Sequence, residues 1–254
     1  MSLKRLILIR HARTTANDDH TIYGKLPDAL IPLSDEGREQ AEEVGQAFKA
    51  HLEKEGWLQK GLRFYISPYQ RTKETTNGIL KAWGMSHPFD VIEHEGLREI
   101  SGGYIEGLSY DDRRTQYPLE LSHYDKHMQP EHQNFTKFFA RYPGAESHAD
   151  VTQRVRVALR DISDDCAITD DAIETAVIVS HAYAIEGMRL ALSRKPPQAF
   201  SMIDCLGNTS ALLIEREEGR RWQEKGLIYG AFGAESMTKN PILSKYQPYV
   251  PKTE

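Results

Sequence analysis

Residues 6–17 read LILIRHARTTAN, and residues 176–182 read AVIVSHA. Each stretch is a short apolar run, rich in β-branched residues, that leads within a residue or two to a histidine, His11 or His181. Short continuous apolar runs of this kind are typical of strands that are buried on both faces in a parallel sheet. Open parallel sheets present functional residues at the carboxyl edge. The two histidines are therefore predicted to lie at the same edge of a sheet.

The rest of the chain alternates between strand and helix patterns. Besides strands at 3–9 and 176–179, the sequence predicts strands at 62–67, 89–92, 210–215 and 226–229, and helices at 34–56, 69–83, 149–162 and 185–192. This alternation predicts an α/β layered sheet. Between about 100 and 145 the periodicity fades and Tyr, His and Gln become frequent, which indicates an insertion that covers a site as a lid. We expect one domain over residues 1–232 and an extended tail over 233–254.

Composition narrows the classes of partner. The 254 residues include 32 Lys and Arg and 37 Asp and Glu, which gives a formal charge of −5 with neutral histidines. A general nucleic-acid binder normally carries a basic excess, so this class is not expected. The two cysteines, Cys166 and Cys205, form neither a disulfide framework nor a zinc motif, which favours a reducing, cytoplasmic location. The apolar run at 6–9 is too short for a membrane span or a signal peptide, so no membrane partner is expected.

Arginines accompany the histidines in a pattern that suits a phosphoryl group. Arg10 precedes His11, and Arg71 follows the predicted strand at 62–67. Guanidinium groups bind phosphate oxygens in a bidentate manner, and a neutral imidazole can attack phosphorus and carry the phosphoryl group covalently. Nearby arginines disfavour the protonated imidazole and so keep the nucleophile available. Glu99, just before the lid, is the leading candidate for the proton donor to the leaving oxygen.

Together these segments resemble the histidine phosphatase superfamily, over about residues 6–229. The resemblance implies the phosphoglycerate mutase-like fold: a doubly wound, mostly parallel sheet flanked by helices. It implies His11 as the phosphorylated nucleophile, with Arg10, Thr14 and Asn17 around the phosphate. Residues 67–72, SPYQRT, are similar to the second arginine motif of the family, which implies Arg71 as a further phosphate ligand and catalytic residue.

Two further segments carry the resemblance. Residues 97–99 with Gly103 and residues 106–107 resemble the acid/base segment, which implies Glu99 as the proton donor. Residues 179–182 resemble the second histidine motif, which implies that His181 contacts the transferring phosphoryl group. Two positions depart from the family. Ala12 replaces the glycine of the best-known form, with a small expected effect, and Gly102 stands where an aromatic residue is common, which alters the expected pocket wall.

The superfamily contains phosphatases, sugar-bisphosphatases and mutases, so the fold does not define the reaction. Residues 23–34 and 138–147 resemble a mutase-like phosphatase branch, and the tryptophan-bearing segment of glycolytic mutases is missing. We therefore expect hydrolysis of the phosphate monoester of a small molecule through a phosphohistidine at His11. Two alternatives stay open: mutase-type phosphoryl transfer, and a non-catalytic regulatory protein that binds a phosphorylated ligand. The substrate and the oligomeric state are open as well.

The predicted lid also carries histidines and tyrosines. His123 and His127 are four residues apart with His132 nearby, but no carboxylate partner accompanies them on a helix. We interpret them as solvated residues or substrate contacts, and expect neither a metal ion nor another cofactor. Four tyrosines could line a wall for the substrate, but packing of the lid is the commoner use of such residues: Tyr104, Tyr110, Tyr117 and Tyr124.

Overall fold

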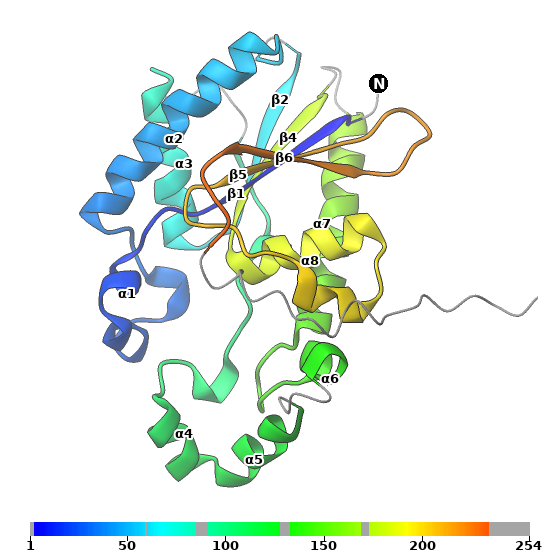
Figure 1. Cartoon of the computed structure of the whole chain (residues 1–254). Coiled ribbons are helices and arrows are strands. Elements are labelled where there is room, and N and C mark those ends of the chain that lie inside the picture. Colours follow the sequence, from blue (N-terminus) through cyan, green and yellow to red (C-terminus); the bar gives the residue numbers. More distant parts are fainter. Residues whose placement is uncertain (1–2, 59, 85–90, 128–132, 169–172, 234–254) are drawn as a thin grey trace, which may run out of the picture.

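The centre of the molecule is a six-stranded sheet (Figure 1). The computed structural model describes residues 3–58, 60–84, 91–127, 133–168 and 173–233. The strands, in the spatial order β3-β2-β4-β1-β5-β6, are β3 (Val91–Glu93), β2 (Leu62–Ile66), β4 (Thr175–Ser180), β1 (Arg5–Arg10), β5 (Ala211–Glu215) and β6 (Gln223–Tyr229). The first four of these run parallel, and β5 and β6 pair antiparallel. The predicted α/β fold with a mostly parallel sheet is confirmed.

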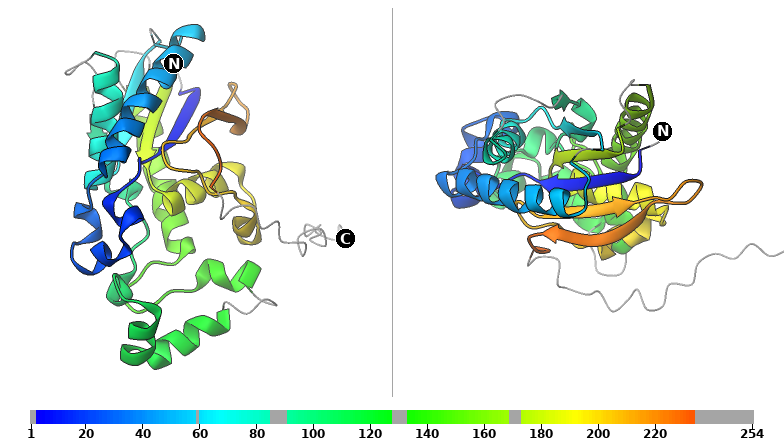
Figure 2. Two further views of the ribbon diagram at one scale, coloured as in Figure 1. Left: turned by 60° about the vertical axis from the view of Figure 1, so that its left-hand side comes forward. Right: turned by 90° about the horizontal axis from the view of Figure 1, so that it is seen from above.

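Helices cover both faces of this sheet, as Figure 2 shows. On one face lie α2 (Asp35–Lys54) and α3 (Gln70–Ala82), and on the other lie α7 (His148–Ile168) and α8 (Ala182–Ser193). The side chains of β1 alternate between the two layers, because Ile7 and Ile9 pack on the first face while Leu6 and Leu8 pack on the second. Burial on both faces explains why this strand reads as a continuous apolar run.

The register of the central strands brings the two histidines to one edge. β1 and β4 pair in parallel, with Ile9 opposite Val179 and Arg10 opposite Ser180. The backbone N–H of His11 then donates to the carbonyl of Ser180 at 3.0 Å. His11 and His181 therefore both leave the sheet at the carboxyl ends of adjacent strands.

Several element boundaries differ from the predicted ones. α7 continues to Ile168, beyond the predicted end at 162, and keeps Cys166 on its buried side. α8 starts directly after His181 instead of at 185. β6 starts at Gln223 instead of 226. Its first three residues are exposed and polar, so they lack the apolar pattern by which a strand is predicted from sequence. Residues 89 and 90 of the predicted strand at 89–92 lie outside the described residues, as does the predicted tail at 233–254 apart from Gly233.

The described part of the lid segment, residues 100–145 without 128–132, contains three α-helices that the sequence did not predict. They lie together beyond the edge of the sheet where β1 and β4 end (Figure 1) and are α4 (Tyr110–Gln116), α5 (Pro118–His127) and α6 (Gln133–Phe139). α5 buries only Leu121, so it lacks the long apolar stripe by which a helix is recognised. Tyr117 and Tyr124 pack with Ile105, Leu121 and Tyr142, which supports the packing role for these two tyrosines.

Short elements complete the chain. They are α1 (Thr15–Asp18) and the 3₁₀ helices η1 (His20–Gly24), η2 (Asp28–Leu30), η3 (Glu95–Leu97), η4 (Gly103–Ile105) and η5 (Pro197–Met202). Several of them are connections that leave the carboxyl edge of the sheet, where α1, η1 and η2 follow β1. Among the described residues, none of the helices combines the length and the apolar character needed to cross a bilayer.

Candidate active site

His11 follows β1 and is buried. Its Nδ1 lies 2.8 Å from the carbonyl oxygen of Ala12. Because a carbonyl only accepts, we assign the proton to Nδ1, which leaves Nε2 with a free lone pair. Burial, together with the charges of Arg71 and Arg10, lowers the pKa of His11 well below its ordinary value. His11 is thus a neutral imidazole at neutral pH, with Nε2 available for attack on phosphorus.

His181 is fully buried, and the centre of its ring lies 5.2 Å from that of His11. Arg71 donates from Nε to Nδ1 of His181 at 3.1 Å, so the proton of the neutral ring belongs on Nε2, which lies 2.7 Å from Oγ of Ser67. Burial, Arg71 and His11 lower the pKa of His181. Both ring nitrogens are bonded to protein groups. For His181 to contact a phosphoryl group as predicted, one of these two hydrogen bonds must break and be replaced by a bond to the phosphoryl group.

Arg71, in the first turn of α3, is buried and binds Asp28 of η2. Nη1 donates to Oδ1 of Asp28 at 2.9 Å and to its backbone carbonyl at 2.6 Å, and Nη2 donates to Oδ2 at 3.1 Å. With the bond to His181, four of the five N–H groups of Arg71 have protein partners. Asp28 was not predicted as a site residue, because nothing in its local sequence marks it as the partner of an arginine 43 positions away.

Arg10, the last residue of β1, donates from Nη1 to the carbonyl of Leu206 at 2.6 Å. Its Nε is buried and has no hydrogen-bond partner among the described residues. The positive charge of Arg10 also acts to lower the pKa of His11 and opposes the rise in the pKa of Glu99. Arg10 therefore places a fixed positive charge near His11 and Glu99.

Thr14 and Asn17 form the start of α1, directly after the histidine motif. The backbone N–H and Oγ1 of Thr14 both donate to Oδ1 of Asn17, at 2.8 and 2.9 Å. This capping box uses the acceptor of the Asn17 amide and leaves its NH₂ group to donate. The predicted contacts of both residues with a phosphate stay predictions. Ala12, which replaces glycine, buries its methyl group against Leu33 and Ala41.

Glu99 follows η3 and precedes the lid segment. One carboxylate oxygen, Oε1, accepts from the backbone N–H of Ile100 at 2.9 Å. Burial raises the pKa of Glu99, although the bond to Ile100 and the charges of Arg71 and Arg10 act in the opposite direction. The charges of the same two arginines thus influence the pKa of both Glu99 and His11. A carboxyl group with a raised pKa can hold a proton for a leaving oxygen.

Besides Asp28, two residues near the site escaped the sequence predictions. Tyr23 of η1 is partly exposed, and its pKa is raised by partial burial and by the charge of Asp28, while the charge of Arg71 opposes this rise. The tyrosine therefore lies near both charged groups. Glu186 of α8 is buried, and burial together with the nearby Glu99 raises its pKa to about 7. Of these two residues, only Glu186 carries a recognisable sequence signal, since it is a charged residue among the mostly apolar residues of a helix.

The two lid histidines that the structure describes, His123 and His127, belong to no cluster of the kind that holds a metal ion. The rings of His123 and His127 lie 5.0 Å apart, and His132 is outside the described residues. Within the part of the chain that the structure describes, no three His, Cys, Asp or Glu side chains gather as possible metal ligands. The candidate site is therefore the edge of the sheet around His11, with arginines as its positive groups.

Comparison with known proteins connects this chain to a family. The sequence profile of the histidine phosphatase superfamily (branch 1) matches residues 6–227. A curated relative, the phosphoglycerate mutase-like protein AT74H of Arabidopsis thaliana, is 31% identical over 190 residues. That alignment covers 70% of this chain and 62% of the relative, so the chain spans less than two thirds of the length of that protein.

Solved structures share the architecture. The alpha-ribazole phosphatase from Shigella flexneri superposes with a TM-score of 0.69 at 20% identity, over 90% of this chain and 98% of that one. A mycobacterial glucosyl-3-phosphoglycerate phosphatase in complex with inorganic phosphate gives a TM-score of 0.65 at 20% identity, over 89% and 98% of the two chains. At these identities the likeness establishes a common fold.

Proposed function

Because the chain belongs to the histidine phosphatase superfamily, we propose that it is a phosphatase that hydrolyses the phosphate monoester of a small molecule through a phosphohistidine at His11. The observation that carries this proposal is the state of His11. Its Nδ1 proton is directed at the carbonyl of Ala12, and burial together with the charges of Arg71 and Arg10 lowers its pKa, so Nε2 is an unprotonated nucleophile in a positive environment.

The first half-reaction transfers the phosphoryl group to the enzyme. The lone pair on Nε2 of His11 attacks phosphorus, and the bond between phosphorus and the ester oxygen breaks. The ester oxygen keeps the electron pair and takes the proton of Glu99, so the alcohol leaves neutral. Arg10 and Arg71 offset the charge on the phosphoryl oxygens, and the carbonyl of Ala12 offsets the charge that develops on the imidazole.

The second half-reaction returns the enzyme to its starting state. Glu99, now a carboxylate, accepts a proton from water while the water oxygen attacks phosphorus. The bond between phosphorus and Nε2 breaks, its electron pair returns to the ring, and inorganic phosphate leaves. Glu99 is again protonated and His11 again neutral, so the cycle needs neither a metal ion nor another cofactor.

Phosphatase activity is preferred over mutase activity, although the superfamily contains both. The solved structures described above include two proteins named as phosphatases, while the curated relative carries a mutase-like name. A mutase must keep its phosphohistidine until a second hydroxyl group arrives. The arrangement around His11 serves both reactions, and the difference lies in whether water or an alcohol reaches the phosphohistidine first.

We expect a phosphorylated small molecule as the partner, with no nucleic acid and no membrane. A reducing, cytoplasmic location is the best match for a chain whose two cysteines, Cys166 and Cys205, are both free thiols.

A panel of phosphate esters, assayed for released phosphate, tests the proposal. Interconversion of the two monophosphoglycerates is measured alongside. Release of phosphate together with an acid-labile phosphoprotein that is missing in His11→Ala supports the phosphatase. Interconversion without net release identifies a mutase, and phosphate binding without either activity identifies a regulatory protein.

A further inference from the structure

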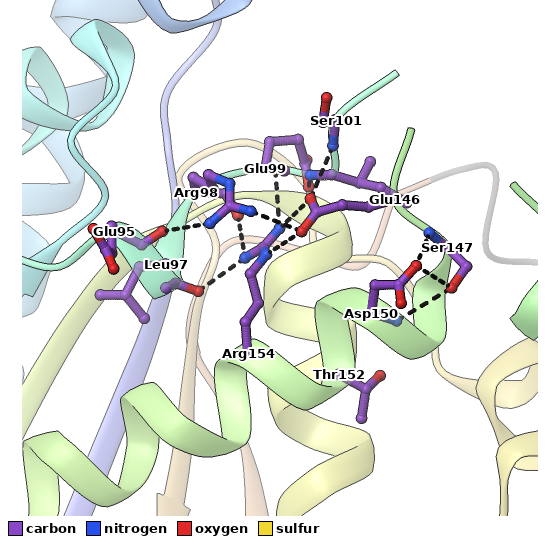
Figure 3. A network of polar contacts seen from close by, with 12 residues as sticks. Glu95, Leu97, Arg98, Glu99, Ser101, Glu146, Ser147, Asp150, Thr152 and Arg154 are labelled. Atoms are coloured by element: carbon purple, nitrogen blue, oxygen red, sulfur yellow. Dashed lines mark hydrogen bonds and ion pairs between the residues drawn. The ribbon is translucent and has the colours of Figure 1, made fainter. Parts of the chain in front are cut away.

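Arg154 of α7 lies at the centre of the polar network in Figure 3. Its side chain is only 13% exposed, and all five of its N–H groups have protein acceptors. Nε donates to Oε1 of Glu146 at 2.8 Å, and Nη2 donates to Oε2 of Glu146 and to the carbonyl of Glu99, each at 3.0 Å. Nη1 donates to the carbonyls of Gly96 and Arg98, each at 2.8 Å. Arg154 thus has no donor left for a substrate.

Three of these acceptors belong to the segment that carries the proposed general acid. The carbonyls of Gly96, Arg98 and Glu99 converge on one guanidinium group, which is rigid, planar and always charged. Hydrogen bonds from a charged donor are about twice as strong as neutral ones. The carboxyl group of Glu99 bonds to the backbone N–H of its own neighbour, Ile100. The place of that carboxyl group relative to His11 therefore depends on how firmly the backbone at 96–99 is held.

Glu146 extends the same network to the two ends of the lid segment. Its Oε2 also accepts from the backbone N–H of Ser101 at 3.0 Å, and its own backbone N–H donates to the carbonyl of Ser101 at 3.0 Å. Burial disfavours the charged carboxylate, but the bonds and charges of Arg154, Ser101 and Arg98 outweigh it and lower the pKa of Glu146. Arg154 and Glu146 together join the ends of the lid to the segment of Glu99.

We propose that Arg154 is a positioning residue that, through the backbone of 96–99, holds the Glu99 carboxyl group where it meets the leaving oxygen. This inference rests on the proposed function, in which Glu99 is the general acid. Catalytic groups need placement to within a fraction of an ångström, and a small displacement costs up to about 100-fold in rate. We call the bonds from Arg154 to Glu146 and to the backbone of 96–99 the clamp. Its loss therefore slows selectively the step in which the acid protonates the leaving oxygen.

The choice of leaving group isolates this step. A dinitrophenyl ester releases an oxygen that is stable without a proton, whereas an alkyl ester releases a basic oxygen that must be protonated. The ratio kcat/KM reports the transfer to His11 and the departure of the alcohol, and is independent of the later attack by water. A defect in the placement of Glu99 thus lowers kcat/KM for the alkyl ester and spares the dinitrophenyl ester.

The experiment measures kcat/KM with dinitrophenyl, nitrophenyl, phenyl and propyl phosphate for the wild type and three variants. Arg154→Lys keeps the charge but has too few donors in the wrong geometry, and Glu99→Gln removes the acid itself. Arg141→Gln is the matched control, because Arg141 pairs with Asp150 at the start of α7 and is 60% exposed. We expect Arg154→Lys to lose about tenfold or more with propyl phosphate and to match the wild type with dinitrophenyl phosphate. Arg141→Gln should follow the wild type throughout.

Each other outcome overturns a distinct statement. If Arg154→Lys loses the same factor in kcat/KM with every ester, Arg154 only supports the fold. If its kcat/KM values all equal those of the wild type, Arg154 has no part in the mechanism. If Glu99→Gln changes kcat/KM by the same factor for every ester, Glu99 is not the general acid, and the proposed function itself is contradicted. If Arg154→Lys does not fold, as judged by circular dichroism, Glu146→Gln replaces it. That variant weakens the same clamp and is expected to show the same selective loss, and an equal loss in it with every ester contradicts the proposal.

Discussion

The carboxylate of Asp28 binds the guanidinium of Arg71 through two hydrogen bonds, of 2.9 and 3.1 Å. This is the fork-to-fork geometry in which arginine also binds a phosphate. The chain therefore places an internal anion on one of its two predicted phosphate-binding arginines. Asp28 orients Arg71, and it also competes with any anion that approaches the same face of the guanidinium.

The Asp28→Asn variant tests whether Asp28 mainly orients Arg71 or mainly competes with a phosphate for it. Asparagine keeps the size and one acceptor but removes the charge, so inorganic phosphate should bind several-fold more tightly. The measurement is the inhibition constant of phosphate against hydrolysis of nitrophenyl phosphate. Weaker inhibition in the variant would mean that Asp28 chiefly orients Arg71.

Replacement of His11 by alanine should abolish turnover. The variant lacks the atom that bonds to phosphorus, so we expect a loss of at least about 1,000-fold in kcat with nitrophenyl phosphate. Circular dichroism should show an unchanged fold, because the backbone N–H of His11 still bonds to Ser180. A variant that stays fully active would transfer the role of nucleophile to another group.

The pH dependence of kcat/KM should reflect opposite shifts at His11 and Glu99. His11 must be neutral, and its lowered pKa keeps it neutral well into the acidic range. Glu99 must be protonated, and its raised pKa extends the protonated form to higher pH. Activity on an alkyl ester should therefore be highest at mildly acidic pH and fall as pH rises through the pKa of Glu99.

The control for this pH profile is Glu99→Gln. The substrate phosphate itself loses a proton near pH 6, at about the value known for phosphate monoesters. That titration remains in the variant, whereas the decline that belongs to Glu99 should vanish. An identical decline in both proteins would assign it to the substrate.

Glu186 should make the folded protein less stable as pH rises. Its pKa is raised to about 7 in the fold, from 4.5 as the ordinary value, so the folded state holds the proton more tightly than the unfolded chain. The stabilisation is complete below the unfolded pKa and is lost as pH rises through about 7, to a limit of about 3 kcal/mol. Denaturant unfolding of the wild type and Glu186→Gln at about pH 5 and about pH 8 checks this. The variant should lose less stability between the two conditions, and an equal loss would place the titration elsewhere.

Chelators should leave the activity unchanged. In the proposed mechanism, Arg10 and Arg71 provide the positive charge that a metal ion provides in metal-dependent phosphatases. The measurement is phosphate release before and after dialysis against EDTA. Loss of activity that zinc restores would point back to the histidines of the lid segment, His123 and His127.

Much of the candidate site was predictable because its residues belong to continuous motifs. His11 and Arg10 end one apolar run and His181 follows another, so strand pattern and chemistry could be recognised together. Arg71 and Glu99 each follow a predicted strand in the same way. The lid helices escaped prediction because they bury few side chains, and the start of β6 escaped because it is exposed.

The sequence by itself determined the α/β class, the family and the candidate residues for binding a phosphate, since each depends on neighbours along the chain. Only the tertiary structure decided which protein groups hold those residues in place. Asp28 meets Arg71 across 43 positions, and Arg154 meets the carbonyl of Glu99 across 55. Such partners come together through the packing of separate elements on the sheet. No local pattern of residue types encodes that meeting, because it depends on the spatial order of strands and helices.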